Sequence, residues 1–233
     1  MSYLRKVWNN LSDNWKNIFI TKFSKTLLKF SKWNTIFISQ KFLEEIYLSE
    51  ELDLQNLNIT DLSGLQLTPN LKKINLNKNL LTSLDGIEKL TLLKELIASK
   101  NSLQNIYPLF LLKNLEFLDI SYNQIHYLFP LFQSNLRVLY CNFNKIKSLD
   151  GLETIKTLEI LDASNNKIEK LDFSLWSSFI REIWVAHNKI VIFDGLFNQN
   201  LNSLEILDLS FNPINKIDLP KNYSFEILLE GIE

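Results

Sequence analysis

Leucine and isoleucine return along most of this chain in one fixed order, with a period of about 22 residues. If the first apolar residue of each period is position 1, positions 4 and 6 are also apolar and the residue between them is usually polar. This alternation over a short run predicts a strand with one buried face. The periods begin at Leu71, Leu93, Leu115, Leu136, Leu158, Ile180 and Leu204, and a degenerate period begins at Ser49.

An asparagine occupies position 9 of every period except the degenerate one, which has Leu57 there. Its amide offers two donors and an acceptor, so it can pair backbone groups that a buried turn would otherwise leave unsatisfied. We expect each amide to bridge its own turn and the next repeat, as a structural ladder. The ladder consists of Asn79, Asn101, Asn123, Asn144, Asn166, Asn188 and Asn212.

Glycine or proline recurs at position 16, which indicates a recurrent turn. The column contains Gly64, Gly86, Pro108, Pro130, Gly151 and Gly195. One strand and one turn in every period predict strands that stack side by side as a parallel sheet.

With these columns, the sequence resembles the leucine-rich-repeat family, in the class of about 22 residues per repeat that internalin-like bacterial proteins share with a phosphatase regulatory subunit. The resemblance covers about residues 49–220, or eight repeats. It implies an α/β solenoid with a curved parallel β-sheet on the concave face and short helical or irregular convex segments. It says little about function, because such proteins share a fold and bind unrelated partners.

Residues 1–48 are expected to form an N-terminal helical cap, because a solenoid leaves the core of its first repeat open to water. One helix is predicted after Ser12 and Asp13, and a second after Ser39. The apolar residues expected to cover the core are Trp15, Phe19, Phe23, Leu27, Phe42, Leu43 and Ile46.

Residues 221–233 are expected to close the other end. Phe225, Ile227 and Leu229 alternate with Glu226 and Glu230, as in a last strand.

Composition favours one continuous structure, since 46% of the 233 residues are hydrophobic. The single cysteine, Cys141, is at position 6 and is predicted to pack in the core. Extracellular members of the family resemble disulfide-capped structures, and this chain has no cysteine clusters. No apolar run follows Arg5 and Lys6, so no secretory signal is expected and a cytoplasmic location is favoured.

Basic residues are concentrated at the start of the chain, where residues 1–41 contain one acid, Asp13. They are Arg5, Lys6, Lys16, Lys22, Lys25, Lys29, Lys32 and Lys41. Interleaved with Trp8, Trp15, Phe30 and Trp33, they could bind an anionic membrane surface or nucleic acid. Alternatively, the lysines solvate the outer face of the cap, a reading favoured by the overall charge of −1.

The concave face is the expected binding surface, since positions 3, 5, 7, 8 and 10 point outward. The first repeats place ordinary polar residues there, whereas the later repeats place aromatic and apolar ones. Trp and Tyr dominate the energetics of protein interfaces, and neighbouring acids would set the orientation of a partner. The candidate partner-binding residues are Phe117, Asp119, Tyr122, Tyr140, Phe143, Ile160, Asp162, Trp184, His187, Asp208 and Phe211. Alternatively, these aromatics only stiffen the sheet by leaning on each other.

Catalysis is not expected. His126 and His187 have no cysteine or second histidine at ligand spacing, so no metal site and no cofactor are predicted. Asp162 and Asp208 lack the enclosed cleft that a hydrolytic pair needs.

The sequence leaves three functional hypotheses that experiments can distinguish. The first is a non-catalytic protein-binding scaffold that docks a partner on its concave face. The second is a peripheral membrane or nucleic-acid adaptor attached through residues 1–41. The third is self-association through the exposed patch.

Overall fold

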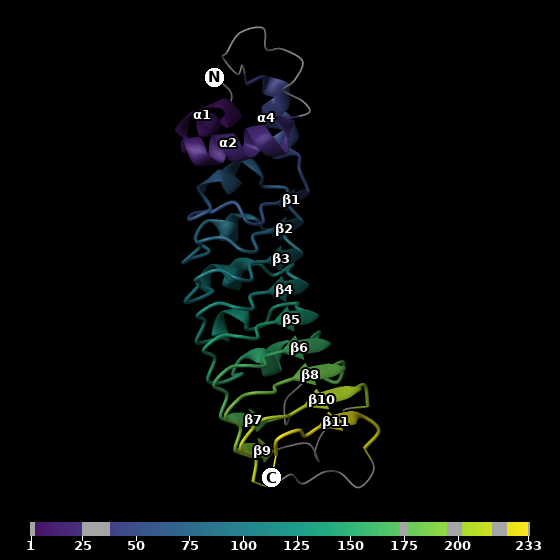
Figure 1. Cartoon of the computed structure of the whole chain (residues 1–233). Coiled ribbons are helices and arrows are strands. Elements are labelled where there is room, and N and C mark those ends of the chain that lie inside the picture. The colour runs from purple at the N-terminus through teal and green to yellow at the C-terminus, as the bar shows by residue number, and fades with distance from the viewer. Residues whose placement is uncertain (1–2, 25–37, 173–176, 195–201, 216–222, 233) are drawn as a thin grey trace.

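The computed structural model describes residues 3–24, 38–172, 177–194, 202–215 and 223–232. The repeats stack into an elongated, gently curving column with helices at its N-terminal end (Figure 1). Each repeat adds one strand on one side of the column and returns along the other.

The strands pair in parallel to form a nine-stranded sheet in the order β1-β2-β3-β4-β5-β6-β8-β10-β11. Each strand covers positions 3 to 5 of its period, so the predicted parallel sheet is confirmed. The strands are β1 (Glu51–Asp53), β2 (Lys73–Asn75), β3 (Glu95–Ile97), β4 (Phe117–Asp119), β5 (Val138–Tyr140), β6 (Ile160–Asp162), β8 (Glu182–Trp184), β10 (Ile206–Asp208) and β11 (Glu226–Leu228).

The opposite, convex side is built from 3-10 helices in the first five repeats. They are η1 (Ser63–Leu67), η2 (Ile87–Lys89), η3 (Tyr107–Leu111), η4 (Phe129–Leu131) and η5 (Leu152–Thr154). The glycine and proline column is where these helices begin: Gly86 and Gly151 have positive φ at the N-caps, and Pro108 and Pro130 lie in the first turns. Gly195 lies outside the described residues.

Two later repeats depart from this pattern. Their convex segments form a small parallel sheet of β7 (Lys170–Asp172) and β9 (Ile192–Asp194), which the sequence analysis does not anticipate.

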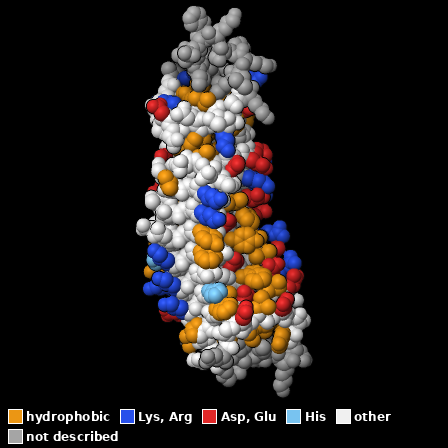
Figure 2. Space-filling model, viewed as in Figure 1, with side chains coloured by type: hydrophobic (Ala, Val, Ile, Leu, Met, Phe, Trp, Pro, Cys, Tyr) orange, Lys and Arg blue, Asp and Glu red, His pale blue; other side chains and the backbone are white. Residues whose placement is uncertain are grey.

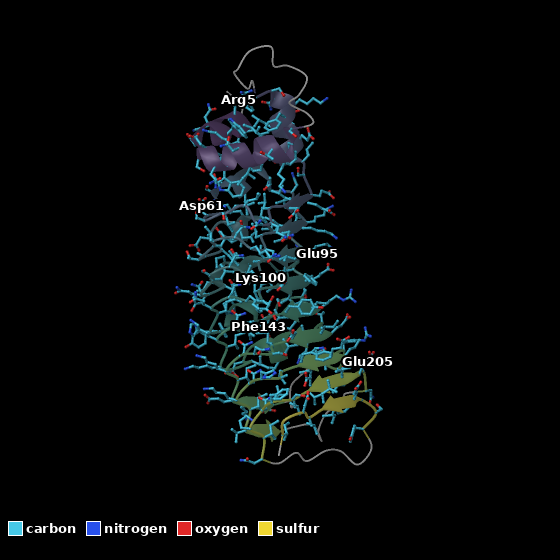
Figure 3. The ribbon with its side chains drawn as sticks, viewed as in Figure 1. Arg5, Asp61, Glu95, Lys100, Phe143 and Glu205 are labelled. Atoms are coloured by element: carbon cyan, nitrogen blue, oxygen red, sulfur yellow. The ribbon has the colours of Figure 1, made fainter. Side chains whose placement is uncertain are left out.

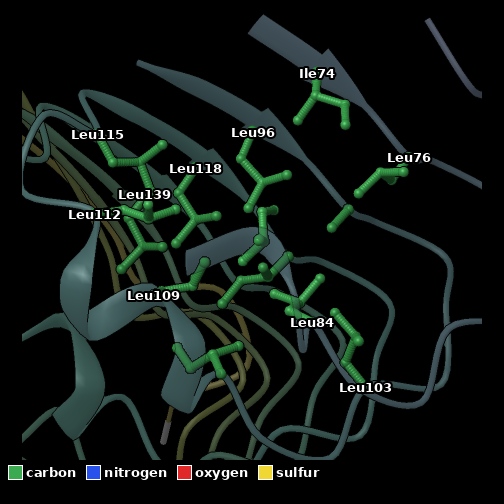
Figure 4. Close-up of a cluster of buried hydrophobic side chains, with 14 of the residues drawn as sticks. Ile74, Leu76, Leu84, Leu96, Leu103, Leu109, Leu112, Leu115, Leu118 and Leu139 are labelled. Carbon is green, nitrogen blue, oxygen red and sulfur yellow. The ribbon is translucent and has the colours of Figure 1, made fainter. Parts of the chain in front are cut away.

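The core is a continuous stack of leucines and isoleucines between the two sides (Figure 4). Position 4 pairs with position 4 across the whole sheet, as in Ile74 with Leu96 and Leu96 with Leu118, and these side chains are fully buried or nearly so. Cys141 is also completely buried, as predicted.

The asparagine ladder is present in all seven repeats, but one part of the prediction is wrong. In Asn144, Oδ1 accepts a hydrogen bond from the backbone N–H of Ile125, and Nδ2 donates to the carbonyls of Ile120 and Cys141. Ile125 and Ile120 belong to the preceding repeat, not to the next one. The same pattern recurs at Asn79, Asn101, Asn123, Asn166, Asn188 and Asn212. Each amide therefore pairs backbone groups in the turn of the preceding repeat.

The N-terminal cap consists of α1 (Tyr3–Asn10), α2 (Asp13–Lys22) and α4 (Gln40–Tyr47). The side chains of Ser12 and Ser39 accept hydrogen bonds from the N–H groups of Trp15 and Phe42, so both predicted N-caps are confirmed. Helix α1 is additional to the two expected helices. Leu27 lies outside the described residues.

The cap covers the first repeat as expected. Trp15, Phe19, Phe42, Leu43 and Ile46 are almost fully buried. The ring of Trp15 lies against Gly64, where a Cβ atom would be 2.0 Å from the indole. At the other end, β11 pairs with β10, which confirms the predicted closing strand, but Leu229 lies beyond that strand and is 37% exposed.

Candidate functional site

The outward side of the nine-stranded sheet, here called the concave face, brings the candidate partner-binding residues together. Figure 2 shows hydrophobic side chains gathered over the middle and lower sheet, with carboxylates among them. Phe117, Tyr140, Ile160 and Trp184 are half-buried on the strands. Tyr122, Phe143 and Phe211 are 45%, 41% and 43% exposed in the turns that follow. We call the eleven candidate residues the aromatic face.

Position 8 of every repeat has a left-handed backbone, with φ between 52° and 57°, although none of these residues is glycine. They are Asn56, Lys78, Lys100, Tyr122, Phe143, Asn165, His187 and Phe211. Non-glycine residues rarely adopt this conformation. Here it turns the chain off the strand while the N–H still donates to the following repeat, as from Phe143 to the Ser164 carbonyl.

The side chains at position 8 stack on one another along the column. The rings of Tyr122 and Phe143 are 4.3 Å apart and 12° from parallel, and Lys100 Nζ lies 5.3 Å from the Tyr122 ring centroid. Figure 3 shows Lys100 and Phe143 along this line. His187 and Phe211 form a second stack at 4.3 Å. These rings therefore stack on each other, as expected if the aromatic residues stiffen the sheet.

Three aspartates at position 5 are held by their own turns. Oδ1 of Asp119, Asp162 and Asp208 accepts the backbone N–H two residues later, at 3.0, 3.0 and 2.9 Å. Asp162 also accepts from Asn142 Nδ2 at 2.6 Å. Asn75 makes the same turn contact at 3.0 Å in an early repeat. The carboxylates are thus fixed in direction before any partner arrives.

Tyr140 lies between two of these aspartates, because the register pairs it with Asp119 on one side and Asp162 on the other. Its ring meets Phe117 edge-on at 5.7 Å. Burial raises the pKa of the Tyr140 hydroxyl, and the charges of Glu182, Asp162 and Asp119 raise it further. The face therefore has a negative local potential.

One edge of the sheet has ion pairs between successive repeats. They are Lys72 with Glu50, Lys94 with Glu116, Arg137 with Glu159, and Arg181 with Glu205, at 2.7 to 2.8 Å. These pairs are exposed, so each contributes little to stability. They do neutralise Arg137 and Arg181, which lie beside the aromatic face.

The early part of the concave face is different in character. Lys73 pairs with Glu95 at 2.8 Å, and Lys22 of the cap lies 3.9 Å from Asp53. Acids and bases are mixed there, and the only aromatic stacking on the concave face among the described residues begins at Phe117 and Tyr122.

The aromatic residues proposed for membrane or nucleic-acid binding are not all available. Trp8 and Trp15 are 6% and 1% exposed and pack in the cap, so their proposed role on an interaction surface is wrong. Phe30 and Trp33 lie outside the described residues.

A second apolar surface on the convex side was missed by the sequence analysis. A hollow of about 280 Å³ is lined by Tyr107, Tyr127, Phe129 and Pro130, with Gln104 and Asn105 at its polar side. The three rings are more than 60% exposed. The signal was available in the sequence, because these aromatics occupy positions 13 and 15, which flank the buried position 14.

No group of three or more His, Cys, Asp or Glu residues within the described ranges could hold a metal ion. No helix in those ranges is both long and apolar enough to cross a lipid bilayer.

Comparison with known families agrees with this architecture. A model described as leucine-rich repeats in two copies matches residues 134–175, and a single leucine-rich-repeat model matches residues 114–134 and 203–223. Both models describe repeats, and neither describes a catalytic domain. The chain therefore has the fold of a leucine-rich-repeat solenoid, and part of its repeats match the leucine-rich-repeat models.

Among solved structures, the chain is similar to internalin C2 from Listeria monocytogenes. The two share 26% identity with a TM-score of 0.78, over 93% of this chain and 92% of that one. The functional domain of internalin J from the same organism is 26% identical, with a TM-score of 0.61. That match covers 92% of this chain and 48% of the other. No curated protein sequence matches the chain.

A third similar structure is a complex of TLR13 with the single-stranded RNA ssRNA13. It is 27% identical, with a TM-score of 0.60, over 72% of this chain and 26% of that one. Proteins of this fold serve as interaction modules, and the surface of each selects its partner.

Proposed function

We propose that this protein is a non-catalytic binding module that docks a partner protein on its aromatic face. The observation that carries the proposal is the contrast within one sheet. Early strands present mixed charges, whereas β4 to β10 present Phe117, Tyr140, Ile160 and Trp184 toward solvent. No described segment of the chain covers them.

The arrangement suits a protein partner for energetic reasons. Interface hot spots are enriched in Trp and Tyr, and they work best when a surrounding polar rim excludes water. Here Tyr140 and Trp184 are central, and the ion pairs of Arg137 and Arg181 form one rim.

Stacking and binding do not exclude each other. The stacks at position 8 hold Tyr122 against Phe143 and His187 against Phe211, which fixes the rings in the free protein. Rings that are already ordered lose less conformational entropy on association. The stacking therefore prepares the surface for binding.

The experiment combines capture with site-specific crosslinking. A photo-crosslinking amino acid replaces Ile160 on the aromatic face in one sample and Tyr107 on the convex side in another. We expect a partner from the source cells to crosslink at position 160 only. Crosslinking at position 107 alone would contradict the proposal.

Matched double variants provide the affinity control. Y140A with W184A should abolish capture and shift the melting temperature only slightly, because both side chains are half-buried on the surface. Y107A with Y127A removes two exposed rings from the convex side and should leave capture intact. Equal capture by both double variants would overturn the assignment of the binding face.

A further inference from the structure

Acidic and aromatic side chains alternate across the middle of the aromatic face. The register aligns position 5 of five consecutive strands, in the order Asp119, Tyr140, Asp162, Trp184 and Asp208. Neighbouring strands of a sheet are about 4.8 Å apart. Each ring is therefore flanked on both sides by a carboxylate.

This surface has a net negative charge. Outward positions 3, 5, 7, 8 and 10 from β4 onward contain six acids among the described residues, namely the three aspartates together with Glu182, Glu226 and Glu230. The basic residues at these positions are three lysines, Lys145, Lys167 and Lys189, all at position 10, so the acids remain in excess. Arg137 and Arg181 lie at the edge of the sheet, where their guanidinium groups already pair with Glu159 and Glu205. The raised pKa of Tyr140 is consistent with this local field.

We propose that the aromatic face binds a cationic segment of its protein partner, with arginine side chains over Tyr140 and Trp184 and ion pairs to the flanking aspartates. The inference rests on the proposed function and specifies the partner's chemistry. Guanidinium groups stack on aromatic rings and donate charge-assisted hydrogen bonds to carboxylate oxygens. Rings and carboxylates placed side by side satisfy both preferences at once.

The carboxylates of Asp119 and Asp208 are held in place by one oxygen each, which suits them to pair with a cationic side chain. In Asp119 and Asp208, Oδ1 is bound to the turn, whereas Oδ2 accepts no hydrogen bond from the described part of the chain. One oxygen thus fixes the carboxylate and the other faces a partner. Such preorganisation lowers the cost of binding.

Charge argues against other occupants of this face. A nucleic acid would bring phosphates against these carboxylates. An uncharged apolar segment would bury them without compensation. A basic segment from a second copy of this chain is a competing occupant, and the test includes it.

The test uses the full chain and short fluorescent peptides in which serine alternates with arginine, lysine or glutamate. Binding is followed by fluorescence anisotropy at about 50 mM and about 300 mM salt. We expect the arginine peptide to bind more tightly than the lysine peptide, the glutamate peptide not to bind, and affinity to fall with salt. Equal binding of arginine and glutamate peptides would overturn the proposal.

Variants locate the interaction. D119N combined with D208N should weaken the arginine peptide roughly tenfold, and Y140A by a similar factor. Asparagine is a conservative replacement because Asn75 already makes the same turn contact at position 5. The matched control is D150N, which removes a charge from an exposed convex turn. An equal loss in D150N would show that only net charge matters and would contradict the site.

Two outcomes separate this inference from the proposed function. If Y140A with W184A abolishes partner capture but neither salt nor D119N with D208N affects it, the face binds protein and the cationic inference fails. If light scattering shows a dimer that D119N with D208N dissociates, the occupant is a second copy and the inference of a separate partner is wrong.

Discussion

The indole of Trp15 lies against Gly64, and this contact joins the N-terminal cap to the first repeat. A Cβ atom at position 64 would be 2.0 Å from Cε3 and 2.1 Å from Cδ2 of the ring. Trp15 is 1% exposed, and its Nε1 donates to Asp61 Oδ1 at 3.3 Å. The ring therefore has no room to move aside without losing both packing and a hydrogen bond.

We predict that G64A destabilises the protein by about 1–3 kcal/mol through overpacking. The measurement is urea denaturation followed by circular dichroism. Combining G64A with W15F should cost less than the sum of the two single substitutions, because the smaller ring leaves space for the methyl group. Simple additivity of the two would contradict the contact.

Asp61 is predicted to make the junction sensitive to acid. Burial alone would raise the pKa of its carboxyl, but hydrogen bonds from the side chain and backbone of Ser63 and from Trp15 outweigh this and lower it. A lowered folded-state pKa means that the ionised group stabilises the fold above the usual carboxyl value of about 3.9. This contribution is lost as the pH falls through the lowered value.

D61N should therefore reduce the stability difference between neutral and acidic pH. Melting temperatures of wild type and D61N, measured from about pH 7 to about pH 3, should converge toward low pH. Curves that stay parallel over this range would show that Asp61 makes no such contribution.

N144A should cost at least about 2 kcal/mol, because several buried backbone groups lose their partner at once. Asn144 is 8% exposed, and its amide contacts Ile125, Ile120 and Cys141. Chemical denaturation measures the loss. The exposed neighbour Lys147 provides the control, and K147A should change stability by less than about 0.5 kcal/mol. Similar losses in both variants would argue against the ladder.

The Tyr140 hydroxyl should titrate at lower pH in D162N than in wild type. Burial, Glu182, Asp162 and Asp119 all raise the Tyr140 pKa in the wild-type protein, and the substitution removes one of these charges. Carbon-13 NMR of labelled tyrosine follows the titration, with Y140F to assign the resonance. D150N should leave the curve in place, and an unchanged curve in D162N would mean that Asp162 does not act on Tyr140.

The repeating columns made the fold predictable from sequence. Leucine or isoleucine at position 4 and asparagine at position 9 each have one role, which recurs from repeat to repeat after the degenerate first one. The closing strand and the caps at Ser12 and Ser39 followed from equally local patterns. In contrast, helix α1 depends on burial of Trp8 against Phe19 and Phe42, which are distant in sequence.

The aromatic face was predictable only as a set of outward positions. The strand period places Tyr140 and Trp184 on one side, but it gives no information on the left-handed backbone that allows Tyr122 to stack on Phe143. The convex hollow was missed for another reason. The repeat pattern identifies position 14 as buried but assigns no role to its exposed neighbours, Tyr127 and Phe129.

The asparagine ladder runs in one direction, since each amide accepts a hydrogen bond from a backbone N–H of the repeat before it. If a further copy of the motif were inserted between two repeats, its asparagine would pair the backbone groups of the repeat before it. The asparagine of the following repeat would then pair the backbone groups of the inserted copy. The scaffold can therefore be lengthened by whole periods without redesigning either end. Its binding surface can be extended in modular steps, each adding one outward strand with its own side chains at positions 3, 5 and 8.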